Sequence, residues 1–237
     1  MNIRLYIDYD NVNRAAKNAG LRDLVTRSLL ATPVPTEAVN GNCDARIYGG
    51  WYEGSILTQA AQKVIGELGR DFPAMLPFRN RRGMTGKCLV TAELACSLEA
   101  EPAHHLFNTY RQRSLPRTLK CVSPASRGCN DQDCPLASLA SLLDTETCPK
   151  NGCSVKLHDV IFQEQQKLVD TMLACDMLHA AQSGCALISL VSSDDDLLPA
   201  IRIVLLRGIP FARLHPKTYY QKAAFPPGGA PLVEIQI

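Results

Sequence analysis

One stretch of this sequence decides the fold, Val191-Ser192-Ser193-Asp194-Asp195-Asp196-Leu197-Leu198-Pro199. It follows the apolar residues 186–190, which are typical of a buried strand. It precedes residues 200–206, whose apolar pattern predicts a helix that ends at Gly208. Three consecutive carboxylates are therefore expected at the carboxyl end of a strand, where a helix begins. In open parallel sheets this is the edge at which ligands bind.

Two explanations fit these adjacent carboxylates. An Asp at the start of a helix caps its free amide groups, and the positive end of the helix dipole favours it. Capping requires one Asp, however, and three neighbouring carboxylates repel one another. A divalent cation is the simplest means of holding them together. On this stretch alone, both the cap and the metal site stay open.

A second corner rich in carboxylates lies at the start of the chain. Residues 3–7 predict a strand, which runs into Asp8-Tyr9-Asp10-Asn11 just before a helical segment. On neighbouring parallel strands the two corners would converge on one point. Because four or five acidic groups in one cleft exceed what helix caps require, the two corners together favour a functional site.

A helix predicted over residues 160–181 adds two further acids. Asp170 shares one side of this helix with Lys167, and we expect it to bind metal. Asp176 falls on an apolar side, where an acid needs a partner, and it either binds metal directly or, as we expect, holds a neighbouring residue in place. Alternating strands and helices with acids at these positions suit two-metal cleavage of phosphodiester bonds. Oxygen ligands select Mg²⁺ or Mn²⁺ over zinc.

Three motifs resemble those of a known family and occur in its order. Ile7-Asp8-Tyr9-Asp10-Asn11 resembles the opening motif of NYN domains, a branch of the PIN-like nucleases. Gln166-Lys167-Leu168-Val169-Asp170 is similar to the Lys-x-x-Asp helix of that family. Residues 192–199 resemble its Ser-x-Asp-x-Asp-Phe-x-Pro motif.

The resemblance implies a metal-dependent ribonuclease that acts on single-stranded or structured RNA. Its fold would be PIN-like (Rossmann-like), an α/β parallel sheet flanked by helices. The resemblance covers residues 1–13 and 158–214, and it extends to residues 14–115 only through the strand–helix pattern. Two features depart from the family: Leu168 stands where Gly is frequent, and a cysteine-rich insertion has no counterpart.

The expected site residues combine the residue pattern with the resemblance, which carries over Asp8, Asn11, Asp170, Asp194 and Asp196. The expected catalytic residues are Asp8, Asp170, Asp194 and Asp196. The expected metal ligands are these four acids and Asp10. The expected supporting residues are Asn11, Lys167, Ser193, Asp195 and Asp176.

Two other functions compete with a ribonuclease. A strand followed by Asp8-x-Asp10 also fits a phosphatase of the haloacid-dehalogenase type, which forms a phospho-aspartate. The Lys-x-x-Asp helix has no role in that chemistry. A non-catalytic RNA-binding scaffold with a vestigial metal site is the other alternative, and the presence of every acid argues against it.

Cations are grouped in the middle of the chain. A basic loop is expected over residues 79–87, and a short helix over residues 104–114. We expect their cations to hold the phosphate backbone of RNA at the sheet edge that carries the acids. These residues are Arg79, Arg81, Arg82, Lys87, Arg111 and Arg113. A solvated loop without a partner is the alternative.

The chain is expected to consist of a divided domain, an insertion and a tail. Residues 116–156 are rich in Ser, Pro, Asp and Cys and lack a long periodic pattern, which is typical of an insertion. It divides the expected nuclease domain into residues 1–115 and 157–216. A tail, residues 217–237, is expected to wrap the surface because prolines and glycines fill residues 226–229.

Paired cysteines mark the insertion. Cys129-x4-Cys134 and Cys148-x4-Cys153, with Cys121 upstream, favour a structural zinc site. A short segment without a core needs such a staple. Disulfides or unconnected thiols are the alternative, and the pattern leaves open which four residues would ligate the zinc.

The composition excludes several classes of protein. The 237 residues are 46% hydrophobic and 20% charged, as in globular domains, and the net charge of +2 is too small to imply a partner. No apolar run reaches the length of a membrane span and the N-terminus lacks a signal peptide, so we expect a cytoplasmic protein without a membrane partner. A protein partner or a homo-oligomer stays open. Further elements are expected as helices at 12–31 and 55–69, and as strands at 45–51, 74–78, 88–98 and 210–214.

Overall fold

The structure, a computed structural model, describes residues 1–237 except 36–37, 114–120, 132, 167 and 219. For residues 111–113 and 163–165 it describes the backbone and not the side chains. The chain forms two compact units. The first unit consists of Met1–Tyr110 and Gln166–Ile237, and the second of Arg111–Gln165. The second unit therefore begins before, and ends after, the insertion expected at residues 116–156.

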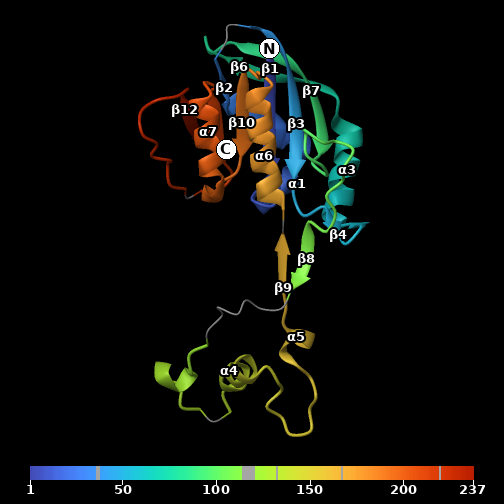
Figure 1. The fold of residues 1–237 in the computed structure, drawn as a ribbon, viewed down its shortest axis with the longest axis vertical. Helices are drawn as coiled ribbons and strands as arrows, with labels where there is room; N and C mark the ends of the chain where they lie inside the picture. Colours follow the sequence, from blue (N-terminus) through green and yellow to red (C-terminus); the bar gives the residue numbers. More distant parts are fainter. Residues whose placement is uncertain (36–37, 114–120, 132, 167, 219) are drawn as a thin grey trace. The chain divides into compact units, whose positions relative to one another are not determined.

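Eight strands in the described part of the first unit form one large sheet (Figure 1). Their order is β12-β11-β10-β1-β3-β7-β6-β2. The neighbours from β12 to β7 run parallel, and β6 pairs antiparallel with β7. The strands are β1 (Asn2–Asp8), β2 (Pro33–Val34), β3 (Asn40–Tyr48), β6 (Ala74–Asn80), β7 (Thr85–Leu94), β10 (Leu187–Val191), β11 (Phe211–His215) and β12 (Leu232–Gln236). This confirms the predicted α/β class with a mostly parallel sheet flanked by helices.

Helices cover both faces of the large sheet (Figure 1). They are α1 (Arg14–Ala19), α2 (Leu21–Ala31), α3 (Gln59–Asp71), α6 (Val169–Gln182) and α7 (Leu198–Leu206). The first three pack on one face, and α6 and α7 pack on the other. Successive residues of β1 point to opposite faces, so Leu5 and Ile7 join the first core and Tyr6 joins the second. In the described part of the chain, no helix is both long and apolar enough to cross a membrane.

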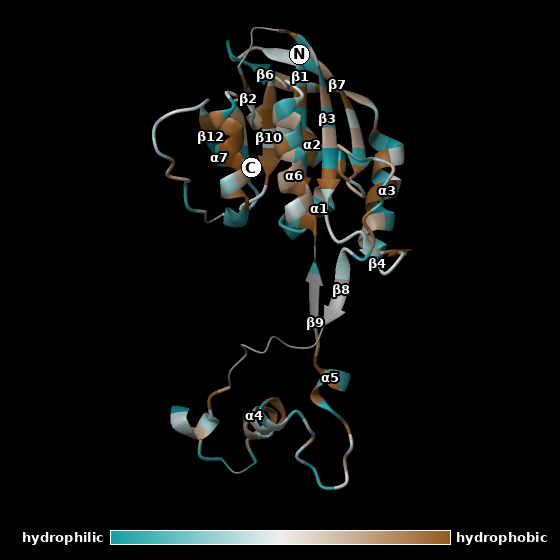
Figure 2. Ribbon diagram, in the orientation of Figure 1, coloured by the Kyte–Doolittle hydropathy of each residue, from teal (hydrophilic) through white to brown (hydrophobic). Residues whose placement is uncertain are grey.

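The central strand β10 is almost entirely apolar, and helices bury both faces of the central strands. All five residues of β10 are buried, as are the last four residues of β1. The hydropathy colouring shows β10 and most of α7 in brown, whereas teal residues occur in β3 and α3 (Figure 2). A strand of this kind is recognised from its sequence by its unbroken apolar run rather than by alternation.

The chain reverses its direction of travel across the sheet between β1 and β10. From β1 it passes over one face, through α1 and α2, towards β3. From β10 it passes over the other face, through α7, to β11. Ile7 is the register partner of Val191, so Asp8 and Ser192 follow at adjacent strand ends. Open α/β sheets bind their ligands at such a reversal point.

Three predicted helices differ in the structure. The helix expected over residues 12–31 is divided at Gly20, whose φ of 94° favours glycine. The helix expected over residues 160–181 begins only at Val169, because β9 (Gln163–Gln166) precedes it. No helix forms over residues 104–113, where β8 (Tyr110–Arg113) occurs.

The last two of these differences have a common cause in the sequence. The strands β8 and β9 join β4 (Tyr52–Glu53) and β5 (Ile56–Leu57) in a small sheet of order β5-β4-β8-β9. β8 and β9 consist almost entirely of polar residues, so apolar periodicity cannot reveal them.

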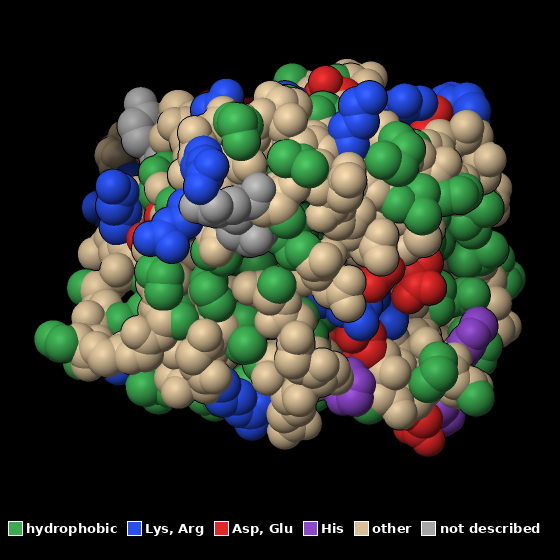
Figure 3. Space-filling view, turned by 90° about the horizontal axis from the view of Figure 1, so that it is seen from above, with side chains coloured by type: hydrophobic (Ala, Val, Ile, Leu, Met, Phe, Trp, Pro, Cys, Tyr) green, Lys and Arg blue, Asp and Glu red, His purple; other side chains and the backbone are tan. Residues whose placement is uncertain are grey.

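The expected basic loop is a hairpin at the opposite edge of the sheet from the acids. β6 extends to Asn80 and β7 begins at Thr85, so only a tight turn separates them. Lys87 is level with Asn40, whereas Asp8 is level with Tyr48, eight residues further along β3. At roughly 3.3 Å per residue this separation is about 26 Å. Figure 3 views the molecule from above in the orientation of Figure 1, and shows Lys and Arg side chains at the left and at the upper right of this face.

The expectation that this hairpin rims the acidic edge is therefore wrong. The reason is the antiparallel direction of β6, which carries the chain back to the amino ends of the parallel strands before the cations occur. The exposed cations concerned are Arg79, Arg81, Arg82 and Lys87.

The tail also differs from its prediction. Residues 232–236 form β12, which pairs in parallel with β11 at the edge of the large sheet. The prolines and glycines at residues 226–229 form only the bend that leads to this strand. The end of the tail is therefore a strand of the sheet.

The second unit has little apolar interior. Its helical segments are η1 (Pro124–Arg127), α4 (Pro135–Thr145) and α5 (Leu157–Val160). Of the side chains described in this unit, Cys134 is the buried one, with 7% of its surface exposed. The unit therefore lacks an apolar core within its described part.

The hairpin depends on the absence of a side chain at Gly86. A Cβ atom there would lie 2.6 Å from the Phe78 ring and 2.7 Å from the carbonyl oxygen of Val39. We expect Gly86→Ala to lower the free energy of unfolding by about 1–3 kcal/mol, because the buried ring and the backbone must shift. Gly66, inside α3 with open space around it, is the matched control, and Gly66→Ala should be neutral or stabilising by up to about 1 kcal/mol.

Urea denaturation of both variants measures these effects. Equal stability of Gly86→Ala and the wild type would show that the close packing of β6 and β7 is not required.

Candidate functional site

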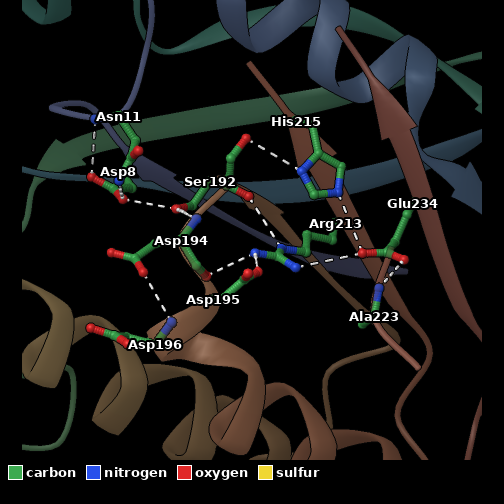
Figure 4. A network of polar contacts seen from close by, with 11 residues as sticks. Asp8, Asn11, Ser192, Asp194, Asp195, Asp196, Arg213, His215, Ala223 and Glu234 are labelled. Carbon is green, nitrogen blue, oxygen red and sulfur yellow. Dashed lines mark hydrogen bonds and ion pairs between the residues drawn. The ribbon is translucent and has the colours of Figure 1, made fainter. Parts of the chain in front are cut away.

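Asp8 ends β1 and is fully buried. Its Oδ2 accepts hydrogen bonds from Asn11 Nδ2 at 2.6 Å and from Ser192 Oγ at 2.8 Å, and Oδ1 accepts one from the Asn11 amide at 3.4 Å (Figure 4). Burial raises the pKa of Asp8, and the hydrogen bonds from Asn11 and Ser192 oppose this rise. Two residues from different strand ends thus hold this carboxylate in one orientation.

The loop after β10 is ordered by its own side chains. Ser192 Oγ accepts a hydrogen bond from the amide of Asp194 at 3.0 Å. Asp194 Oδ1 accepts one from the amide of Asp196 at 2.9 Å, which caps the short helix η2 (Asp195–Leu197). Asp194 therefore does act as a helix cap, with one of its two oxygens. Because Asp194 already caps η2, helix capping does not explain why Asp195 and Asp196 are also acidic.

Asp195 turns to a buried arginine on the neighbouring strand. Arg213, on β11, is fully buried and donates through Nη2 to Asp195 Oδ1 at 2.9 Å and to the carbonyl of Asp194 at 2.8 Å (Figure 4). Its Nε donates to the carbonyl of Ser192 at 3.3 Å. Asp195 therefore forms an ion pair with Arg213, whereas Asp194 caps η2.

Ser193 does not contact the acids. Its Oγ lies 3.3 Å from Nδ1 of His215, a buried ring whose Nε2 lies 3.4 Å from Glu234. Burial, followed by the charge of Arg213, lowers the pKa of His215. The serine that holds Asp8 is Ser192, so the expected supporting role of Ser193 moves to its neighbour.

Sequence reasoning missed both Ser192 and Arg213. A signal for Ser192 was present, because the Ser-x-Asp-x-Asp motif begins at this residue. Arg213 lies inside an apolar strand with no motif around it, and only the pairing of β10 with β11 brings it beside the loop.

Asp10 lies at the exposed rim of the same edge. Its Oδ2 accepts a hydrogen bond from the amide of Gly50 at 2.9 Å, which ties the loop after β1 to the loop after β3. The carboxylate is therefore held near the acids on β1 and the loop after β10 without being buried among them.

Asp170 shows that the five expected acids come together. It is half-buried in the first turn of α6. Burial, followed by the charges of Asp8, Asp194, Asp196 and Asp10 in that order, raises its pKa to about 6. The helix N-terminus favours an ionised carboxylate. At Asp170 burial and like charges outweigh this effect.

The donor set fits a hard cation in its chemistry. All five side chains offer carboxylate oxygens, which Mg²⁺ and Mn²⁺ prefer. In the part of the chain that the structure describes, no group of three or more His, Cys, Asp and Glu side chains is arranged to hold a metal ion. Several oxygens instead accept hydrogen bonds from the protein, those of Asp8 from Asn11 and Ser192, and one of Asp194 from Asp196. Ligation of one cation by these acids would require side-chain rotations.

The expected cations are not placed at this edge. Lys167 lies outside the described residues. Arg111 and Arg113 belong to β8 in the small sheet, and their side chains are not described. The remaining four lie on the hairpin at the other edge, as described above.

Asp176 belongs to a separate network on the same sheet face. It is 1% exposed, and its Oδ2 accepts a hydrogen bond from Tyr48 Oη at 2.7 Å and lies 3.7 Å from Arg46 Nη2. Its Oδ1 accepts one from the Glu99 amide at 2.8 Å, and its backbone carbonyl accepts one from Tyr6 Oη at 3.2 Å. Through these contacts Asp176 joins α6 to β3 and to the loop after β7.

The cysteines of the second unit form two pairs rather than one group. A hydrogen bond from the Cys129 thiol, with backbone amides at the start of α4, lowers the pKa of Cys134. A backbone amide and the Cys153 thiol lower the pKa of Cys148. Cys134 precedes α4 and Cys148 follows it, so the pairs belong to opposite ends of that helix. Cys121 is exposed and contacts only its neighbour among the described residues, and a zinc site on these cysteines stays a prediction.

A scan against protein-family models, a search among curated proteins and a search among solved structures each gave no match to this chain. What can be inferred of its function therefore rests on the site. Its central feature is the meeting of acids from β1, from α6 and from the loop after β10.

The repulsion at Asp170 predicts a stabilising substitution. Asp170→Asn should raise the thermal midpoint by roughly 2–4 °C at pH 8 without added divalent cation, because a charge is removed from among like charges. Below about pH 4 the carboxyl group is protonated in the folded and unfolded states, so the two proteins should then be equally stable. As pH rises through about 6 the wild type loses stability relative to the variant.

Asp195→Ala is the control, and it should lower the midpoint because it removes a partner of the buried Arg213. Scanning calorimetry at several pH values measures both variants. A midpoint of Asp170→Asn below that of the wild type at pH 8 would contradict close approach of the five acids.

Asp176 should be required for stability rather than for activity. Asp176→Ala leaves Tyr48 and the Glu99 amide without their buried acceptor and removes a partner of Arg46, so we expect a loss of about 3 kcal/mol or more. Asp176→Asn, which keeps an acceptor oxygen, should lose less. Urea denaturation measures the difference. Full stability with lost activity in Asp176→Ala would assign Asp176 to the functional site.

Proposed function

We propose that this protein is a metal-dependent ribonuclease of PIN-like fold that hydrolyses phosphodiester bonds. One observation carries the proposal, the meeting of five carboxylates at the reversal point of the sheet, near enough for four of them to raise the pKa of the fifth, Asp170. A cluster of like charges is costly unless a cation offsets it. Function at such a point is also what the topology of open α/β sheets favours.

The positions of the three motifs support the family resemblance. The first motif ends β1, the second begins α6 and the third follows β10. More than 150 residues separate the first motif from the second in the sequence, yet their acids interact. In the NYN family the three motifs contribute to one site. The proposal that RNA is the substrate rests on this resemblance.

The residues divide into ligands and their supports. Asp8, Asp170, Asp194 and Asp196 would hold Mg²⁺ or Mn²⁺, with Asp10 at the rim. When bound, the ion supplies neutralisation of charge on the phosphate and lowers the pKa of the attacking water.

The protein's own residues hold the acids in defined positions in the absence of an ion. Asn11 and Ser192 orient the carboxylate of Asp8. The cap at η2 orients Asp194, and Arg213 keeps Asp195 away from the other acids. These contacts hold the backbone that carries the acids, so binding of an ion would require rotations of the carboxylate side chains and not of the loop.

Asp8→Asn and Asp194→Asn should each reduce RNA cleavage by roughly a hundredfold or more. Substituting a residue that only orients a metal ligand typically lowers metal affinity or activity by about 10- to 100-fold. Substituting a ligand itself should lower activity by at least as much. Asp23→Asn is the matched control, since Asp23 lies on α2 and pairs with Arg27 on the helix surface at 2.8 Å. Cleavage of labelled single-stranded RNA with Mn²⁺ or Mg²⁺ measures the rates, and thermal unfolding shows that each variant is folded.

Two parallel assays separate the other functions. Hydrolysis of a generic phosphomonoester without RNA cleavage would identify a phosphatase. Retention of RNA without cleavage by the wild type would identify a binding scaffold. Unchanged turnover by a folded Asp194→Asn variant would contradict the nuclease proposal.

A further inference from the structure

A buried positive charge lies directly behind the acidic site. Arg213 is 0% exposed, and a buried guanidinium is costly unless acceptors surround it. Two carboxylates balance it, Asp195 at 2.9 Å from Nη2 and Glu234 at 3.6 Å from Nη1. Among the described residues Nη1 has no hydrogen-bond partner, so Glu234 holds it by charge alone.

Three of the contacts made by Arg213 reach one loop. They go to the carbonyls of Ser192 and Asp194 and to the side chain of Asp195. The planar guanidinium offers these donors in a fixed geometry that an ammonium group cannot reproduce. Arg213 therefore sets the path of the backbone that carries two of the expected metal ligands.

The contacts of Arg213 continue into the acids through a chain of hydrogen bonds. Ser192 is shared between Asp8, which accepts from its Oγ, and Asp194, whose amide donates to the same Oγ. Figure 4 shows this chain from Asn11 to Glu234. A substitution of Arg213 should therefore alter the positions of both Asp8 and Asp194.

Arg213 also separates the three adjacent aspartates. It attracts Asp195, the middle one, and so leaves Asp194 and Asp196 to the side of the loop that interacts with Asp170. Without this cation, three neighbouring carboxylates would compete for one position.

The C-terminal strand completes the arrangement. Glu234 on β12 lies 6% exposed between Arg213 and His215, and it accepts a hydrogen bond from the amide of Ala223 at 2.9 Å. The tail, which is remote from the acids in the sequence, therefore contacts the residue that orders their loop.

We propose that Arg213, held by Glu234 of β12, is a positioning residue that arranges the loop Ser192–Asp196 for binding a divalent cation. The inference rests on the proposed function, since it assumes that this loop supplies metal ligands. Arg213 contacts the backbone and Asp195, so it acts through the loop and not on the substrate.

Arg213→Lys tests the proposal, and Arg46→Lys is its matched control. Both arginines are buried on strands of the same sheet and pair with acids, but Arg46 belongs to the Asp176 network. Both variants should lower the thermal midpoint. Only Arg213→Lys should weaken Mn²⁺ binding in calorimetry, by roughly tenfold or more, as when partners of metal ligands are changed. Its kcat should fall while KM for RNA changes little.

Glu234→Gln is a milder variant, because it changes neither the loop Ser192–Asp196 nor any of the five acids of the site. It should fold even where Arg213→Lys does not, and should weaken Mn²⁺ binding several-fold. Mn²⁺ binding by Arg213→Lys or Glu234→Gln equal to that of the wild type overturns the inference alone. An equal loss in Arg46→Lys overturns it also, because the effect would then be one of general stability. A wild type that binds no Mn²⁺ overturns the proposed function together with it.

Discussion

The parallel pairing of β1 with β10 is the interaction on which the site depends. It sets Ile7 beside Val191, so that Asp8 and Ser192 follow at the same level on adjacent strands. Their hydrogen bond joins residues 184 positions apart in the sequence. Because the chain leaves these two strands over opposite faces of the sheet, neither following helix covers the space between their ends. The acids at the two strand ends are thereby brought close enough for their charges to act on Asp170.

Two buried polar networks hold the elements around this cluster. One joins Asp176, in the second half of α6, to Tyr48 and Arg46 of β3. The other joins Arg213 of β11 to Glu234 of β12, and fixes the loop after β10. Removing one partner of a buried charge pair costs more than the pair contributes, so such networks specify one arrangement. These supports surround carboxylates whose own charges oppose their approach, and their hydrogen bonds and ion pairs offset that repulsion.

The sequence was sufficient for β10 and the end of β1, because residues buried on both faces of a parallel strand are mostly apolar. It also indicated the five acids at β1, α6 and the loop after β10, since each follows or begins an apolar element. It failed at β8 and β9, whose polar residues carry no periodic signal, and at the hairpin cations, whose edge depends on the direction of β6. Arg213 was missed because a single charge within an apolar strand has meaning only once its neighbouring strand is known. Local pattern thus predicted elements and ligands, whereas strand order and direction decided which side chains meet.

Anomalous diffraction from a crystal soaked in Mn²⁺ tests the central claim most directly, because it locates the cation without reference to activity. The account predicts an anomalous peak bounded by the carboxylates of Asp8, Asp170 and Asp194, with the side chains rotated from their present hydrogen bonds towards it. It also predicts that Asp195 remains on Arg213. A well-ordered acidic edge without a peak at saturating Mn²⁺, or a peak only elsewhere on the molecule, would contradict the account.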